Sequence, residues 1–129
     1  NRDRLALDVE MRLEDARTAY EELVGSVDVV TCNPPYIPDG QVPVDPEVRD
    51  HDPALALYGG SADGLAIPVA MAGRAARLLR PGGTLAIEHA DVQGAALLRR
   101  LAESGEWSVA TDHPDLTGRP RVLTAARRP

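Results

Sequence analysis

Short hydrophobic segments alternate with Pro- and Gly-rich breaks along the whole chain. Residues 27–32 are a nearly continuous β-branched run, which is typical of a strand covered on both faces. Residues 84–88 have the same pattern, whereas residues 9–13 alternate apolar and charged positions, as a half-buried strand does. Two further strands are predicted at 106–111 and 122–126.

The remaining apolar positions recur at helical spacing. Residues 16–24 suit a short helix, and residues 91–103 predict a longer one with its leucines on one side. A third helix is predicted to enter at 61–63 and to run to Arg80, where the Pro-Gly-Gly sequence stops it. Residues 33–51 are polar and rich in Pro, so a loop is expected there.

The resulting order of elements predicts an α/β fold. Strands that alternate with helices form a parallel sheet that is covered on both faces. The last two strands follow one another without a helix, so we expect them to pair antiparallel at one end of the sheet.

Composition narrows the class of protein. The 129 residues are enough for one domain with a core, and the net charge of -6 disfavours nucleic acid as a partner. One cysteine, Cys32, leaves no internal disulfide, and the sequence has no signal-peptide pattern or membrane-length apolar run. These features predict a cytoplasmic protein without a membrane contact. The chain does not begin with Met, so we expect it to start inside a longer gene product.

The most specific motif is Asn33-Pro34-Pro35-Tyr36, directly after the predicted strand 27–32. Ligands of open α/β sheets bind outside the carboxyl ends of the strands, which is where this turn lies. The two prolines lack backbone donors, so the carbonyls of the turn are free to face a ligand. Asn33 adds an amide and Tyr36 a flat aromatic face.

These groups suit a planar NH2 group on an amide or an adenine. The Asn33 oxygen and the Pro34 carbonyl can accept its two hydrogens, which would direct the nitrogen lone pair toward an electrophilic methyl group. The rate then comes from orientation and from stabilising the charge that develops on nitrogen. The alternative is a rigid turn without chemistry, because Asn-Pro is a common start of a turn.

With the residues around it, the motif resembles the S-adenosylmethionine-dependent release factor glutamine methyltransferases (the HemK/PrmC family). The resemblance covers nearly the whole chain and identifies residues 1–129 as the C-terminal part of a methyltransferase domain, truncated at its N-terminus. It rests on the Asn33 motif and on these further segments: residues 50–60, 63–65, 79–83, Glu88-His89 and 118–121.

The resemblance implies methylation of N5 of the Gln side chain in the Gly-Gly-Gln motif of release factors. Asn33 and Pro34 would hold the substrate amide, Pro35 would line the site and Tyr36 would stack on the amide. Asp15 corresponds to an acid that contacts the adenine of the cofactor, with Asn33 beside it. Glu88 and His89 are assigned to the architecture of the site, and Arg121 matches a family arginine without an assigned role. Asp52-Pro53 stands where the family often has Glu-Pro.

The family's glycine-rich cofactor loop has no counterpart in these residues, so we expect the fragment alone to be inactive. The resemblance implies the strand order 3-2-1-4-5-7-6, with residues 9–13 as strand 3 and residues 27–32 as strand 4. Without strands 1 and 2, residues 9–13 would lose their neighbour and residues 27–32 would become an exposed edge. We therefore expect the fragment to form a strand-exchanged homodimer or a larger assembly.

Two other functions fit the sequence less well. An N6-adenine methyltransferase of DNA or RNA shares the motif, but the acidic charge argues against it. A non-catalytic α/β fragment would keep the fold and not bind cofactor. Metal sites at Asp50-His51-Asp52 or His89 and Asp91 fit no strong ligand spacing, and Cys32 is expected to be a buried small residue rather than a nucleophile.

Overall fold

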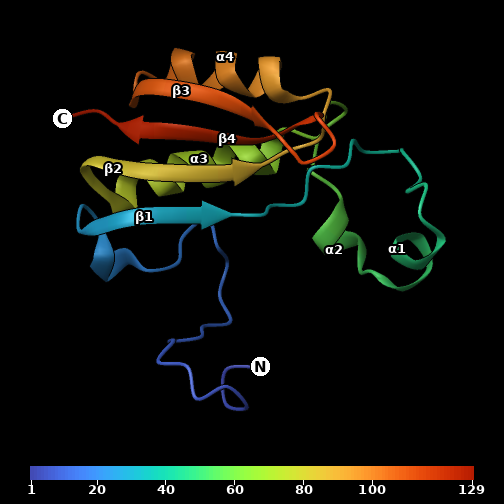
Figure 1. Cartoon of the computed structure of the whole chain (residues 1–129), viewed down its shortest axis with the longest axis horizontal. Coiled ribbons are helices and arrows are strands. Elements are labelled where there is room, and N and C mark those ends of the chain that lie inside the picture. The colour runs from blue at the N-terminus through green and yellow to red at the C-terminus, as the bar shows by residue number, and fades with distance from the viewer.

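A computed structural model describes all 129 residues as one four-stranded sheet with helices packed against it (Figure 1). The strands are β1 (Val27–Cys32), β2 (Leu79–Glu88), β3 (Trp107–Pro114) and β4 (Pro120–Arg127). Their order in the sheet is β1-β2-β4-β3. β1 pairs parallel with β2, whereas β4 is antiparallel to both β2 and β3. The parallel pair and the antiparallel hairpin predicted from the sequence are both confirmed, and the order corresponds to strands 4-5-7-6 of the expected methyltransferase sheet.

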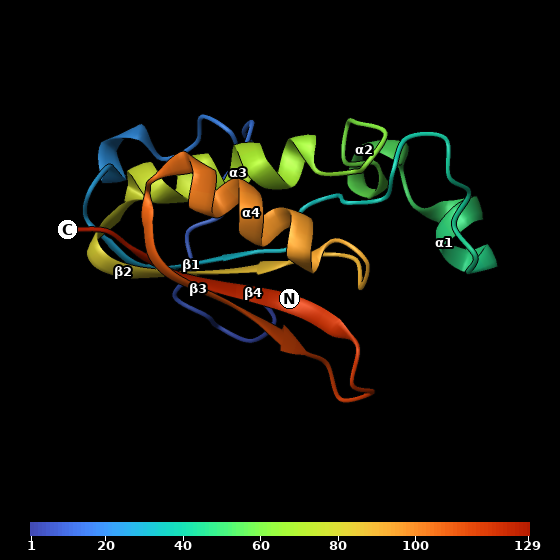
Figure 2. The same cartoon turned by 90° about the horizontal axis from the view of Figure 1, so that it is seen from above.

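The two long helices cover one face of the sheet (Figure 2). They are α3 (Ala66–Leu78), which packs on β1 and β2, and α4 (Gly94–Ser104), which packs on β3 and β4. In β2, Leu85 and Ile87 are fully buried beneath the helices, and Thr84, which points the other way, is exposed. The expectation of a sheet covered on both faces is therefore wrong for this chain, because both long helices lie on the same side.

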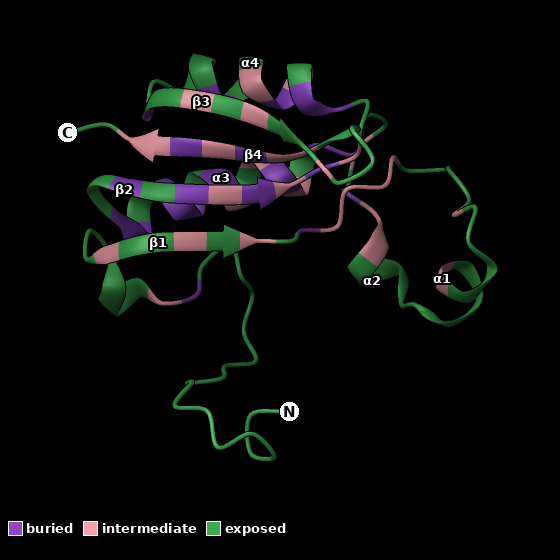
Figure 3. Ribbon diagram, viewed as in Figure 1, coloured by how far each residue is buried: buried purple, intermediate pink, exposed green.

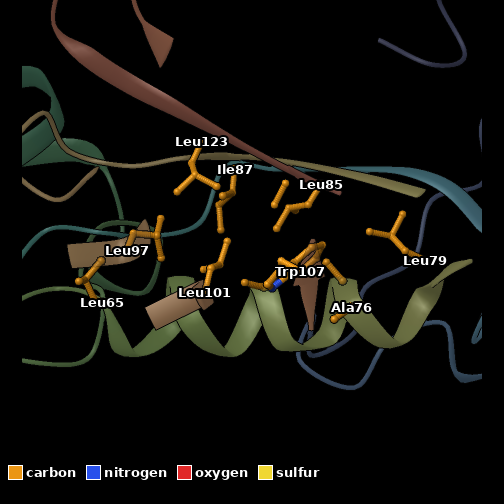
Figure 4. Packing of buried hydrophobic residues seen from close by; sticks show 12 residues of the cluster. Leu65, Ala76, Leu79, Leu85, Ile87, Leu97, Leu101, Trp107 and Leu123 are labelled. Carbon is orange, nitrogen blue, oxygen red and sulfur yellow. The ribbon is translucent and has the colours of Figure 1, made fainter. Parts of the chain in front are cut away.

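The core lies between this sheet face and the two helices (Figure 4). Leucines of α4 meet aliphatic side chains from β2 and β4, and Trp107 lies beside Ala76 of α3. Each fully buried Leu or Ile stabilises the fold by roughly 1.5–3 kcal/mol relative to an exposed position. The central members are Leu85, Ile87, Leu97, Leu101 and Leu123.

The first 26 residues differ from the prediction. Residues 9–13 form no strand and lie exposed (Figure 3). The sheet consists of β1, β2, β4 and β3, and none of these strands pairs with residues 9–13. The helix predicted at 16–24 is reduced to the 3-10 helix η1 (Glu21–Leu23). Tyr20 just before it has φ 61, a left-handed conformation that a continuous α-helix does not contain.

The loop expected at 33–51 ends in a helix. α1 (Pro46–His51) begins at Asp45, whose side chain accepts from the Glu47 backbone N–H, and it has Pro at its first position. A second short helix, α2 (Ala54–Leu57), follows immediately. Both lie beyond the carboxyl end of β1, away from the sheet (Figure 1), and none of the helices combines the length and the hydropathy needed to cross a membrane.

Candidate functional site at the end of strand β1

The Asn33–Tyr36 turn leaves the sheet at the carboxyl end of β1, as predicted. Pro34 is buried, Pro35 and Tyr36 are half-buried, and Asn33 is exposed. Neither the Asn33 side chain nor the Pro34 carbonyl accepts a hydrogen bond within the chain. Two strong acceptors are therefore left unpaired in a turn whose backbone is restricted by two prolines.

Tyr36 ties this turn to the neighbouring strand. Its hydroxyl donates to Glu88 Oε1 at 2.9 Å, and Glu88 is the last residue of β2. Burial raises the pKa of the Tyr36 phenol, and the hydrogen bond to the Glu88 carboxylate raises it further. The phenol therefore stays neutral as a donor, and its ring keeps a fixed position beside the turn.

Two hollows lie on either side of the Asn33–Pro35 backbone. The larger, of about 610 Å³, is bordered by residues 14–17, by Cys32 to Pro35, and by three apolar side chains: Leu55, Ile67 and Met71. The smaller, of about 260 Å³, lies between the turn and helices α1 and α2, and includes Tyr36, Val48, Asp52 and Leu57. Asn33, Pro34 and Pro35 border both hollows, so the turn forms the wall between them.

Asp15 and Asn33 both border the larger hollow. The Asp15 carboxylate pairs with Arg17, with Oδ2 2.6 Å from Nη2, and these hydrogen bonds lower the pKa of Asp15 to about 2. The segment is held by Arg74 of α3, whose buried guanidinium donates to the backbone carbonyls of Thr18 and Ala19. Asp15 is thus placed by a helix rather than by the strand predicted before it.

The side chains of Glu88 and His89 have different hydrogen-bond partners. Glu88 faces Tyr36, whereas His89 is fully buried behind the site, with Nε2 3.0 Å from Asp112 Oδ1 and Nδ1 2.8 Å from the Ala90 carbonyl. Arg121 donates from Nη1 to the His89 carbonyl at 3.2 Å. His89 and Arg121 therefore join β2 to the β3–β4 hairpin at the rear of the site.

Cys32 borders the larger hollow, and burial raises the pKa of its thiol to about 11. The thiol is therefore neutral at ordinary pH, which suits a packing residue. No group of three or more His, Cys, Asp or Glu side chains is placed to hold a metal ion.

Sequence reasoning missed two kinds of residue at the site. Leu55, Ile67 and Met71 come from helices and carry no chemical motif, so only the fold brings them together. Gln93 lies just before α4, and its buried amide binds the Tyr36 carbonyl. A single Gln between a strand and a helix gives no signal in the sequence that separates it from a surface residue.

The fold and the position of the site define a partial Rossmann-like methyltransferase fold. The structure of a T. thermophilus 16S rRNA methyltransferase, solved in complex with AdoMet and guanosine, matches 97% of this chain and 26% of its own with a TM-score of 0.54. The sequence identity is 21%, so this likeness concerns the fold alone.

The sequence itself is similar to release factor glutamine methyltransferases, and the resemblance predicted from the Asn33 motif is confirmed. The Streptomyces coelicolor enzyme of that name is 49% identical over 92% of this chain, which spans 42% of that relative. A 4-amino-L-phenylalanine/4-methylamino-L-phenylalanine methyltransferase of Streptomyces pristinaespiralis is 48% identical over 88% of the chain, which spans 38% of it. The chain thus covers less than half the length of these relatives, and no protein-family model matches it.

Proposed function

We propose that this chain forms the substrate-facing part of an S-adenosylmethionine-dependent methyltransferase that methylates N5 of a glutamine side chain in a release factor. The observation that carries the proposal is the Asn33–Tyr36 turn, which presents free acceptors between two hollows. The similarity to enzymes named release factor glutamine methyltransferase supports the choice of substrate. The proposal places the protein in translation termination and in the cytoplasm, which suits a chain with one free cysteine.

In the proposed mechanism, the amide of the substrate enters from the smaller hollow. Asn33 Oδ1 accepts one amide hydrogen and the Pro34 carbonyl accepts the other, so the nitrogen lone pair faces the larger hollow. The Tyr36 ring covers the plane of the amide. As the nitrogen gains a bond to carbon, positive charge develops on it, and the two acceptors bind this charged state more strongly than the neutral amide. The nitrogen then releases one of its hydrogens as a proton to water, which leaves a neutral N-methyl amide.

The residues of the larger hollow fit S-adenosylmethionine in part. Asp15 remains a carboxylate, which can accept hydrogen bonds from amino or hydroxyl groups, and Ile67 and Met71 offer apolar surface. When bound, the cofactor supplies an electrophilic methyl group on a sulfonium. These 129 residues contain no Gly-x-Gly turn between a strand and a helix that would hold the rest of it.

A second candidate substrate is a small aromatic amine. It is favoured by the relative named for 4-amino-L-phenylalanine methylation, and by the apolar Val48, Ala56 and Leu57 of the smaller hollow, which an aromatic ring could contact. An arylamine NH2 group can use the same two acceptors as an amide. A competition assay with a release factor and 4-amino-L-phenylalanine would separate the two.

Asn33→Ala tests the proposed chemistry. In the complete gene product that contains these residues, we expect transfer of a labelled methyl group to a release factor to fall by about 100-fold or more, because orientation and charge stabilisation are lost together. Calorimetric titration with S-adenosylmethionine, run in parallel, shows how much of the loss arises from cofactor binding.

The exposed residue Asn1 provides the control variant, Asn1→Ala, which should keep full activity. Methyl transfer by Asn33→Ala that stays within about tenfold of the unsubstituted protein would contradict the role of Asn33. Transfer to an adenine-containing oligonucleotide but not to a release factor would replace the proposed substrate.

A further inference from the structure

Gln93 makes hydrogen bonds to two other segments around the site and one within its own segment. Its Nε2 donates to the carbonyls of Tyr36 and Asp63, each at 2.8 Å, and its Oε1 accepts from the Ala90 backbone N–H at 2.9 Å. The side chain is only 4% exposed. Both amide hydrogens and the amide oxygen are therefore used inside the protein, in a place where water cannot replace them.

The backbone approaches this amide closely at Gly64. A Cβ atom at Gly64 would lie 2.2 Å from the Tyr36 carbonyl oxygen and 2.7 Å from Gln93 Nε2. Gly64 has φ +71, a backbone conformation that glycine adopts without strain. The turn before α3 thus presses against the end of the Asn33–Tyr36 turn, and Gln93 bridges the two.

Tyr36 is held at both ends by residues near the end of β2. Its hydroxyl binds Glu88 and its carbonyl binds Gln93, whose own oxygen binds Ala90. The peptide plane after Tyr36 is held from two sides, because its carbonyl accepts from Gln93 Nε2 and its N–H, that of Ile37, donates to the Leu57 carbonyl. Loss of the Gln93 contact would leave only the bond to Leu57, and we expect the looser plane to shift the turn that carries Asn33.

We propose that Gln93 is a positioning residue that sets the orientation of the Asn33–Tyr36 turn toward the substrate amide. The inference rests on the proposed function for its catalytic consequence and on the structure for the contact itself. Gln93 touches neither hollow, so it acts through Tyr36.

Gln93→Glu is the test, because it keeps the shape of the side chain and removes its N–H donors. The carboxylate would face two carbonyl oxygens, whereas its protonated form regains one donor. In the complete gene product we expect turnover at about pH 8.5 to fall by about tenfold, and the deficit relative to the unsubstituted protein to narrow toward about pH 6. The Kd for S-adenosylmethionine should change by less than about twofold, because Gln93 makes no hydrogen bond to Asp15 or to any other residue that borders the larger hollow.

The pH readout requires a reference because other titratable groups face this position. They are Asp63 before α3 and Arg100 of α4 beside it, Glu88 and His89 at the end of β2, Tyr36 in the turn, Asp112 on β3 and Arg121 on β4. All of them are present in the unsubstituted protein, so the ratio of the two turnovers isolates residue 93. Gln41→Glu, at an exposed position of the loop before α1, is the matched control and should keep the unsubstituted profile.

Amide hydrogen exchange provides a second readout that needs no activity. Ile37 N donates to the Leu57 carbonyl and Gly59 N donates to the Ile37 carbonyl, directly beyond the turn. Gln93→Glu should speed exchange at both amides at high pH. Unchanged exchange, or turnover that falls equally at every pH, would overturn the positioning role. If the unsubstituted protein does not methylate a release factor, the proposed function fails, and the exchange result still decides whether Gln93 holds the turn.

Discussion

Asn33 and Asp15 approach the same hollow from different parts of the chain. Asn33 is fixed by the prolines that follow it, so its place could be predicted from the strand and the motif alone. Asp15 could be predicted only through the family resemblance, because its support is the buried Arg74 on a helix far along the sequence. Local chemistry is visible in a sequence, whereas a contact between residues 55 positions apart is not.

Cys32 provides a test of the environment at the end of β1. Burial raises the pKa of its thiol from about 9 to about 11, so at pH 8 the reactive thiolate fraction is roughly 100-fold smaller than for a free cysteine. We expect alkylation of the 129-residue chain by iodoacetamide to be slower by about that factor.

Guanidinium unfolding is the control for this prediction, because it should restore the rate of a free thiol. Above about pH 9 this thiol ionises in the unfolded chain but stays neutral in the folded protein. Its ionisation therefore lowers the free energy of unfolding only above that pH. A folded-state alkylation rate equal to that of a free thiol would contradict the buried environment.

At the scale of the elements, the strands of the sheet largely follow the hydrophobic pattern of the sequence. The short helices α1 and α2, which lie beyond the end of β1, do not. β1, the second half of β2 and the β3–β4 hairpin carry their own periodicity, so they could be predicted. The prediction was wrong for residues 79–83, which were expected to end a helix and form a break but begin β2. α1 and α2 are short and lie in a polar, Pro-rich stretch, where capping at Asp45 rather than an apolar face sets the helix. Residues 9–13 have the alternating pattern of a strand, but a strand forms only beside a neighbouring strand. The sequence of the segment does not show whether such a neighbour exists.

Gly64→Ala tests how tightly the turn before α3 meets the site. The new methyl group would overlap the Tyr36 carbonyl and the backbone would be strained at φ +71, so we expect the free energy of unfolding to fall by roughly 2–4 kcal/mol. Urea denaturation followed by circular dichroism measures this change.

Gly82→Ala is the matched variant, because Gly82 has φ +76 and nothing within 4 Å of an added Cβ. It should cost only about 1 kcal/mol, which is the backbone strain alone. Equal losses for the two substitutions would mean that the close approach to Tyr36 contributes nothing.

At the scale of the whole molecule, the sheet ends in two open edges, β1 and β3. Val29 of β1 is 58% exposed, and the rest of that strand is mostly apolar, which favours pairing with a second chain. We expect the 129-residue chain to self-associate through β1 at about 100 µM, and Val29→Lys to make it monomeric in sedimentation velocity.

Val109→Lys on the opposite edge strand is the control. Val109 is 64% exposed, but β3 also carries Asp112, His113 and Pro114, which disfavour pairing, so this substitution should leave association unchanged. A monomeric unsubstituted chain, or equal effects of the two lysines, would contradict association through β1.

The parallel pairing of β1 with β2 also bears on the order of folding. β3 and β4 are joined by a tight turn, and β2 adds to them across one helix, so these contacts close short loops. β1 reaches β2 only after the long connection that contains α1, α2 and α3, which makes its pairing the entropically costliest in the sheet. We therefore expect the strand that carries the Asn33 turn to join the sheet last, so that its site forms only when the rest of the domain is already in place.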